Sequence, residues 1–181
     1  MERQEGLKLV KSKLKNKNLV KHALATQSCM EALAQHFGED EEAWTMAGLL
    51  HDLDYEDTKD DFSLHGFVTS EMLEKEGVDK EIIEAIKAHP GHIERTSKMA
   101  KALYAVDPLT GLIVSATIMH PEKRLSAVDT EFVLRRFKEK RFAAGANREQ
   151  INACQELGLE LSEFVTICLE AMQRISKELG L

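Results

Sequence analysis

Apolar residues recur every three or four positions along nearly the whole chain, which is the period of an amphipathic α-helix. Strand-like alternation is scarce, and only three prolines interrupt the helical pattern. We therefore predict an all-α fold, a single-domain helical bundle, and not a doubly wound sheet. Helices are expected over about residues 3–15, 18–37, 40–51, 63–73, 79–89, 97–106, 108–120, 130–138, 147–157 and 162–179.

Capping residues set the ends of these predicted helices. Asp40, Asp79 and Asn147 each precede an apolar-periodic stretch and are predicted to be N-caps. Pro108 suits the first turn of a helix, so we predict a break before it, with Asp107 as a candidate N-cap. The acidic segment YEDTKDDFS, residues 55–63, is predicted to be a loop.

The length of 181 residues is enough to bury the core of one domain. No repeat or linker marks a boundary, so we expect one domain over 1–181, with a core at about 18–120 and a helical extension at about 121–181. The last helix has an apolar face that would pack on this core or on a second copy of the chain, which leaves a homodimer open. Its residues are Phe164, Ile167, Cys168, Ala171 and Ile175.

Composition and charge restrict the expected partners. The chain is 43% hydrophobic and 30% charged, which is typical of a globular protein. Its formal net charge of −7 argues against non-specific binding of nucleic acid. The lysines from Lys8 to Lys21 make the first stretch basic, either as a solvated helix face or as a funnel for an acidic substrate.

No apolar run approaches the length of a membrane crossing, and the N-terminus lacks the apolar segment and cleavage site of an export signal. We therefore expect a cytoplasmic protein that does not act in a membrane. The three cysteines, Cys29, Cys154 and Cys168, lack CxxC spacing. They are predicted to be buried thiols and not a disulfide framework or a thiolate zinc site.

Several ionisable residues fall on the apolar faces of different predicted helices. His89 follows Ile86 at helical spacing, and His51 extends the apolar stripe of the helix before it. His22 and Asp107 occupy equivalent positions on two further helices. Each could be explained alone as a hydrogen-bonded core residue or a helix cap. One core rarely needs so many unrelated buried polar groups, so together they predict a shared site.

The chemistry of this set points to a metal. Imidazoles and carboxylates without a thiolate are ligands of first-row divalent transition metals, and bundle cores build such sites from several helices. We predict one or two ions, with Fe or Mn as first candidates and Zn, Ni or Co as alternatives. Asp52, beside His51, has two oxygens and is the natural bridge between two ions.

The spacing of these residues resembles the H…HD…D signature of the HD-domain superfamily of metal-dependent phosphohydrolases. GLLHDLDY is similar to the family's LLHDIG segment. SLHGFVTSEMLEKEGVDKEIIEAIKAH is similar to the segment that adds two histidines in members with two metals. The resemblance covers about residues 18–120. Two positions depart from it, because Asp54 replaces a small residue and Tyr55 replaces a lysine.

The resemblance also implies a role for each ligand. The first metal would be bound by His22, His51, Asp52 and Asp107. The second metal would be bound by Asp52, His65 and His89. His92 would be a further ligand or a substrate contact.

Two such ions would activate a water molecule for attack on phosphorus. The resemblance therefore implies hydrolysis of a phosphoester or phosphoanhydride in a small molecule of the nucleotide type, with Asp52 and His92 as catalytic residues. Lys140, Arg141 and Arg148 are predicted to bind the substrate phosphate, with solvated surface residues as the alternative. Asp54 would either orient a metal ligand or hydrogen-bond substrate hydroxyls.

Two other functions would use the same ligands. One is a di-iron oxygenase that acts on a small polyol or phosphonate. The other is a metal-binding regulatory module without turnover. Dioxygen consumption, compared with phosphate release, would separate the oxygenase from the hydrolase.

Overall fold

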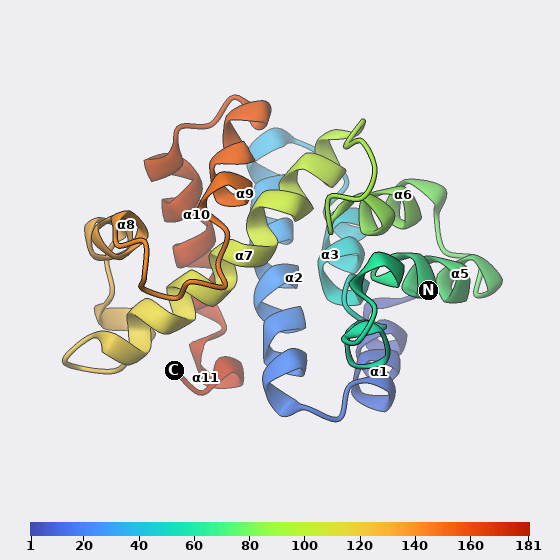
Figure 1. Cartoon of the computed structure of the whole chain (residues 1–181), viewed down its shortest axis with the longest axis horizontal. Helices are drawn as coiled ribbons and strands as arrows, with labels where there is room; N and C mark the ends of the chain where they lie inside the picture. Colours follow the sequence, from blue (N-terminus) through green and yellow to red (C-terminus); the bar gives the residue numbers. More distant parts are fainter.

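The computed structural model describes residues 1–181 and contains eleven α-helices, three short 3₁₀ helices and no β-strand (Figure 1). The predicted all-α fold is therefore confirmed. The helices are α1 (Arg3–Lys13), α2 (Lys17–Phe37), α3 (Glu41–Leu50), α4 (Tyr55–Thr58), η1 (Phe62–Leu64), α5 (Phe67–Lys75), α6 (Lys80–Ala88), α7 (Lys98–Met119), η2 (Leu125–Ala127), α8 (Thr130–Lys138), α9 (Arg148–Asn152), η3 (Ala153–Leu157), α10 (Leu161–Arg174) and α11 (Ser176–Leu179).

The centre of the fold is a helical hairpin formed by α2 and α3. Gly38 ends α2 in the left-handed conformation, and the Asp40 side chain accepts a hydrogen bond from Ala43 N to start α3. The two helices approach closely at Gly48, where a Cβ atom would lie 2.8 Å from the backbone of Gln27. Only glycine fits there, so this residue sets the distance between α2 and α3.

Helix α7 crosses α2 as one continuous helix, which makes the predicted break at Pro108 wrong (Figure 1). Ser97 caps the helix, and Pro108 lies inside it. A proline in a helix interior costs about 3 kcal/mol, but Val106 and Leu109 on either side are fully buried. Tertiary packing therefore offsets the cost, and Asp107 is a mid-helix residue, not an N-cap.

Several smaller boundary predictions also need correction. The segment 55–63, predicted to be a loop, contains α4 and most of η1. Thr130, predicted from the sequence to cap the helix over 130–138, is instead its first helical residue, and Asp129 is the N-cap. The last predicted helix is divided at Ile175 into α10 and α11. The N-caps predicted at Asp79 and Asn147 are confirmed, because both side chains accept backbone hydrogen bonds.

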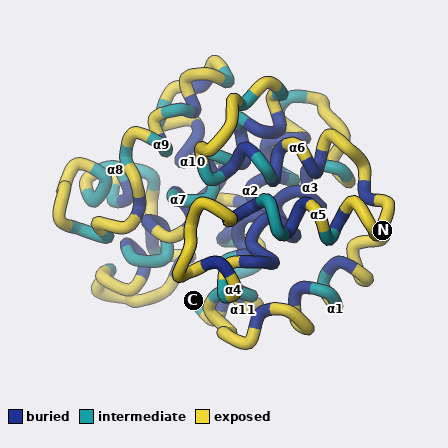
Figure 2. Tube along the Cα trace, turned by 45° about the vertical axis from the view of Figure 1, so that its right-hand side comes forward, coloured by how far each residue is buried: buried dark blue, intermediate teal, exposed yellow.

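The C-terminal helices extend the same hydrophobic core. Helix α10 packs on α2 and α8, and it buries Phe164, Cys168 and Ala171. Figure 2 shows the buried residues concentrated where α2, α3 and α6 meet, with exposed residues on the outer loops. The apolar face of the last helix is therefore used in packing within the chain.

Helix α7 has the length and apolar composition of a membrane-crossing helix. It is the central helix of the bundle and contacts α2, α6, α8, α9 and α10. A core helix needs the same composition, so its burial accounts for its hydropathy. The expected cytoplasmic location stays a prediction.

Candidate metal centre

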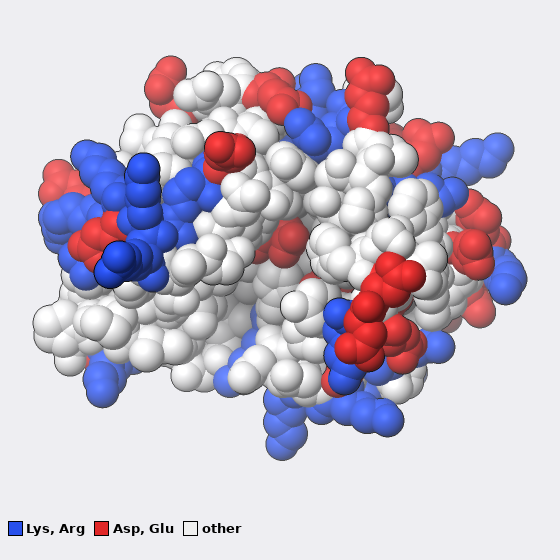
Figure 3. Space-filling view, in the orientation of Figure 1, with Lys and Arg blue, Asp and Glu red and all other residues white.

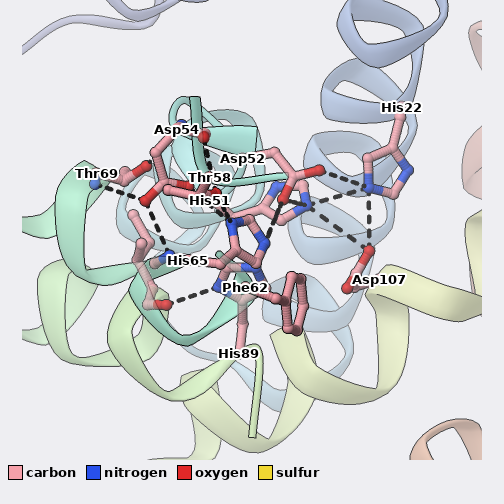
Figure 4. Close-up of polar contacts among 12 residues, drawn as sticks. His22, His51, Asp52, Asp54, Thr58, Phe62, His65, Thr69, His89 and Asp107 are labelled. Atoms are coloured by element: carbon pink, nitrogen blue, oxygen red, sulfur yellow. Dashed lines mark hydrogen bonds and ion pairs between the residues drawn. The ribbon is translucent and has the colours of Figure 1, made fainter. Parts of the chain in front are cut away.

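Six ionisable side chains from five parts of the fold converge on one point beside the α2–α3 hairpin (Figure 4). His51 is the first residue after α3 and His89 the first after α6, so both helices end at the site. His65 follows η1, while His22 and Asp107 come from α2 and α7. We call this group the His–Asp cluster; it comprises His22, His51, Asp52, His65, His89 and Asp107.

Each of the four histidines has its Nδ1 atom held by an oxygen. The Nδ1 to oxygen distances are 3.0 Å for His22 to Thr110, 2.9 Å for His51 to Gly48, 2.8 Å for His65 to Asp54 and 2.6 Å for His89 to Ile86. The Thr110 hydroxyl donates to the Asp107 carbonyl, so it accepts from His22. Carbonyl and carboxylate oxygens only accept, so every Nδ1 carries the proton. In the neutral form of each ring, the Nε2 atom therefore has the free lone pair.

These lone pairs face one another. The Nε2 atoms of His22 and His51 lie 3.1 Å apart, and the same distance separates those of His65 and His89. Two acceptors at this distance repel unless a cation lies between them. Ligands bound about 2.0–2.2 Å from one ion lie about 3.0–3.5 Å apart, so the spacing fits a shared metal.

The two carboxylates complete this arrangement. Asp52 Oδ1 lies 3.3 Å from His65 Nε2 and 3.5 Å from His89 Nε2, while its Oδ2 lies 3.4 Å from His22 Nε2. Asp107 Oδ1 lies 3.0 Å from His22 Nε2. Asp52 Oδ1 also lies 3.4 Å from His51 Nε2, so this one carboxylate lies within 3.5 Å of all four Nε2 atoms, where a bridging ligand is expected. Two groups of side chains could hold a metal ion, namely His22, His51 and Asp107, and His51, Asp52 and His89. The predicted division of the ligands between two ions stays a prediction.

The carboxylates and histidines of the cluster shift one another's pKa values. Burial raises the pKa of Asp52 and of Asp107, but the surrounding histidines outweigh it and hold both pKa values below the usual range. Burial lowers the pKa of His51, yet the carboxylates of Asp52 and Asp107 raise it overall. For His89 burial dominates, and its pKa is lowered. The carboxylates are therefore ionised at neutral pH and available to a cation.

Asp54 lies behind the cluster and not in front of it. Its side chain is fully buried, and its Oδ2 accepts from Gly66 N and Thr69 N at 2.9 Å each. Its Oδ1 accepts from His65 Nδ1. With both oxygens occupied inside the protein, it cannot reach a substrate hydroxyl, so the substrate-binding prediction for Asp54 is wrong. Its other predicted role, orienting a metal ligand, agrees with these contacts.

A cavity of about 640 Å³ opens over the cluster. Figure 3 shows acidic side chains near the centre of this face of the molecule, surrounded mostly by uncharged residues. The lining of the cavity includes Tyr55 and Phe62 from the segment after α3, and Asn147 and Gln150 from the C-terminal part. No lysine or arginine lines it.

Arg148 is held within the protein. Its guanidinium donates to backbone carbonyls, including those of Ala143 at 2.8 Å and Ala146 at 2.6 Å. It also reaches the carbonyl oxygens of Arg136, Phe137, Glu139 and Phe142. The predicted phosphate contact is therefore wrong, because the donors of Arg148 organise the 139–147 loop, whose residues Ala143, Gly145, Ala146 and Asn147 line the cavity.

The three remaining residues that the sequence predicted for the site do not line the cavity. Lys140 and Arg141 are exposed on the outer face of the 139–147 loop, so the solvated-surface alternative describes them. His92 is also exposed, and its Nε2 donates to the Phe62 carbonyl at 2.9 Å. Its ring packs beside those of Phe62 and Phe67 and does not line the cavity, which does not support a catalytic or ligand role.

Sequence reasoning missed Thr110 and the cavity walls. Thr110 lies three residues after Asp107, on the same face of α7. The predicted break at Pro108 placed the two residues in different elements, so their shared face was not predicted. Tyr55 was noticed only as a departure from a motif. Phe62 and Gln150 carry no local signal, because their position depends on how distant segments pack.

Comparison with known proteins gives consistent matches. A family model described as HD domain matches residues 19–116. Ribonuclease Y 2 of Levilactobacillus brevis is 32% identical over 94 residues, which cover 52% of this chain and 18% of the relative. Ribonuclease Y of Staphylococcus epidermidis is 30% identical over 135 residues, covering 73% and 26%. Ribonuclease Y of Acetivibrio thermocellus is 26% identical over 167 residues, covering 90% and 32%.

The chain spans about a fifth to a third of the length of these curated relatives. No solved structure gives a significant match. The matched family segment contains every member of the His–Asp cluster.

Proposed function

The chain belongs to the HD-domain family, and we propose that it is a metal-dependent phosphohydrolase that acts on a phosphorylated small molecule of the nucleotide type. HD domains bind divalent metals, and two groups of His and Asp side chains in this chain could hold such an ion. The observation that carries the proposal is the convergence of four Nε2 lone pairs on the Asp52 carboxylate, with each Nδ1 proton held elsewhere. Such a site is built for cations.

In the proposed reaction, the residues of the chain would have distinct roles. His22, His51, Asp52 and Asp107 would hold one ion, and Asp52, His65 and His89 the other. Bound ions would lower the pKa of a water molecule and screen a phosphoryl oxygen. The buried partners of the Nδ1 atoms fix the imidazoles, so little reorganisation is needed when the site is loaded. The cavity walls would position the ester group beside the cluster.

The relatives provide a second candidate, because their printed name is ribonuclease. The matches cover 52% and 73% of this chain, and RNA is a chain of phosphodiesters. In this candidate the cavity would receive one phosphodiester of an RNA strand. A substrate panel that contains both nucleotides and short RNA separates the two.

The test is metal analysis and turnover of the purified protein after reconstitution with Mn²⁺ or Fe²⁺. We expect one to two ions per chain and release of product from at least one phosphate ester. Asp52→Ala should lose bound metal and at least about 100-fold in turnover, since the bridging ligand is removed. Asp60→Ala, which changes an exposed carboxylate outside the cluster, is the matched control and should behave as wild type.

A wild-type chain with no affinity for Mn²⁺ or Fe²⁺ would contradict the proposed hydrolase function. Equal turnover by Asp52→Ala and wild type would do the same. Dioxygen consumption without ester hydrolysis would favour the di-iron oxygenase instead.

A further inference from the structure

The walls of the cavity above the His–Asp cluster are electrically neutral. Apart from the cluster itself, the lining consists of apolar, hydroxyl and amide groups, and no lysine or arginine is among them. The basic residues of the C-terminal part are turned away, with Arg148 donating to backbone carbonyls. Lys21 lines a neighbouring cavity of about 380 Å³, which meets this one at His22 and Gly111. No lysine or arginine therefore lines the cavity in which the phosphate would react.

This neutrality limits the charge that the site can accept. Two divalent ions would be offset by the carboxylates of Asp52 and Asp107 and by one hydroxide, which leaves a single net positive charge. A phosphomonoester carries about 1.5 to 2 negative charges at neutral pH, and a phosphodiester carries one. Charge that is left unpaired in a partly buried site is costly. The site therefore matches a monoanion better than a dianion or a polyphosphate.

Two exposed aromatic rings stand at the edge of the same cavity. Tyr55 is 41% exposed and Phe62 is 52% exposed, although rings of this size are usually buried. Their centroids lie 5.6 and 4.9 Å from that of His65. The His92 hydrogen bond to the Phe62 carbonyl holds this segment in place. Exposed rings beside a reaction centre offer a stacking surface for a flat group.

We propose that the substrate is a phosphodiester monoanion with an aromatic group, such as a nucleobase or aryl ring, that packs against Tyr55 and Phe62. This proposal rests on the proposed phosphohydrolase function and narrows it. The oxygen of water bonds to phosphorus, the bond from phosphorus to one ester oxygen breaks, and that oxygen takes up a proton. The products are an alcohol and a phosphomonoester. The second negative charge of the product favours its release from neutral walls.

The first test measures binding to the Mn²⁺-loaded protein by calorimetry, without turnover. The probes are diphenyl phosphate, dimethyl phosphate and phenyl phosphate. Diphenyl phosphate should bind at least about tenfold more tightly than either of the others, since it alone has both one charge and two rings. Equal or tighter binding of phenyl phosphate would overturn the charge argument.

The second test changes the ring. Phe62→Leu should lower the affinity for diphenyl phosphate about tenfold and leave the affinity for dimethyl phosphate unchanged. Phe62→Tyr, which keeps an aromatic ring, should bind diphenyl phosphate as wild type does. Met119→Ala removes an equally exposed apolar side chain that does not line the cavity, so it should bind like wild type. An unchanged affinity in Phe62→Leu would overturn the stacking argument.

Turnover measurements distinguish a failure of the diester proposal from a failure of the proposed phosphohydrolase function. Bis(4-nitrophenyl) phosphate should be hydrolysed at least about tenfold faster, in kcat/KM, than 4-nitrophenyl phosphate. Preference for the monoester would overturn the diester proposal and leave the phosphohydrolase standing. Selective binding of diphenyl phosphate with hydrolysis of neither nitrophenyl ester would overturn the hydrolase and leave the binding preference standing.

Discussion

Each histidine of the His–Asp cluster depends on the oxygen that holds its Nδ1 proton. Three of these oxygens are neutral, and only His65 donates to a carboxylate, that of Asp54. A charged acceptor makes the imidazole more basic and fixes its ring more firmly than a carbonyl does. Asp54 is therefore the residue behind the cluster whose replacement should alter metal binding most clearly.

Asp54→Asn tests this at the scale of one residue. The amide has the same size but only one acceptor atom. It therefore loses either the bond from His65 Nδ1 or both bonds from Gly66 N and Thr69 N, which share Oδ2 of Asp54. We expect metal affinity to fall about 10–100-fold, measured by competition with a chelator. Asp57→Asn, at an exposed position on α4, is the control. Wild-type affinity in Asp54→Asn would show that the contact does not orient His65.

The pH dependence of metal binding is a second residue-scale prediction. Burial lowers the pKa of His65, but Asp52 and Asp54 raise it more, to about 9. Because this pKa lies above the ordinary value of 6.5, protonated His65 stabilises the metal-free fold fully below about pH 6.5. That stabilisation is lost as the pH rises through about 9.

A metal ion needs the unprotonated Nε2 of His65 and must displace this proton. The apparent affinity should therefore increase with pH up to about 9 and then level off. Calorimetric titrations at several pH values between 6 and 9 would measure it. Affinity that stays constant over this range would contradict the assignment of His65 as a ligand.

Among the elements, the α2–α3 hairpin controls the site most directly. The Gly48 carbonyl accepts from His51 Nδ1, so the helix contact and the position of a metal ligand depend on the same turn of α3. Any change that separates α2 from α3 also moves His51 away from His22.

Gly48→Ala should separate them. The added Cβ would lie 2.8 Å from the Gln27 Cα and from the Thr26 carbonyl oxygen, which are backbone atoms and cannot rotate away. We expect a loss of about 2–3 kcal/mol in the free energy of unfolding. This corresponds to a fall in melting temperature of about 4–12 °C.

Gly111→Ala provides the matched comparison for that variant. This glycine lies inside α7 with nothing within 4 Å of its Cβ position. Alanine should therefore stabilise the protein by about 0.5–1 kcal/mol through helix propensity. Similar melting temperatures for the two variants would show that α2 and α3 are not tightly packed at Gly48.

The 139–147 loop is the second element that shapes the site, and Arg148 holds it. Arg148→Ala would leave several carbonyl oxygens without their donor, and Ala143 already has an unfavourable φ of 44°. We expect KM for a hydrolysed ester to rise about tenfold while metal content stays unchanged. Arg141→Ala, on the exposed face of the loop, should leave KM as in wild type. Loss of metal in Arg148→Ala would mean that the loop supports the cluster itself.

At the scale of the whole molecule, the cluster connects helices that are distant in sequence. Its ligands come from α2, the ends of α3 and α6, the segment after η1, and α7. A bound ion would therefore hold the two sides of the cavity together. Without a cation, the facing lone pairs and buried charges oppose this packing.

Metal removal should accordingly lower global stability. At a free metal concentration about 100 times the Kd, one bound ion adds about 2.7 kcal/mol to the free energy of unfolding. The melting temperature should rise by about 5–11 °C with Mn²⁺ and fall again with EDTA. Asp52→Ala should lose this dependence. A melting temperature that does not respond to Mn²⁺ in wild type would count against a site that links the helices.

The sequence by itself determined the fold class and the members of the cluster. Helical phase is a local property, so the pattern around His51, His89 and Asp107 was enough to predict that these side chains face inward. The H…HD…D spacing then indicated the family, which the comparison with known proteins confirmed. The roles of these residues as metal ligands stay predictions.

Only the tertiary structure decided how the ligands are held and what surrounds them. The partners of Asp54 and Arg148 depend on where distant backbone atoms lie, and no local pattern encodes that. Helix α7 continues through Pro108 because burial on both sides outweighs a local cost. For the same reason the basic residues predicted to meet the phosphate point elsewhere. Charged residues can be counted along a sequence, but packing decides where each charged side chain points.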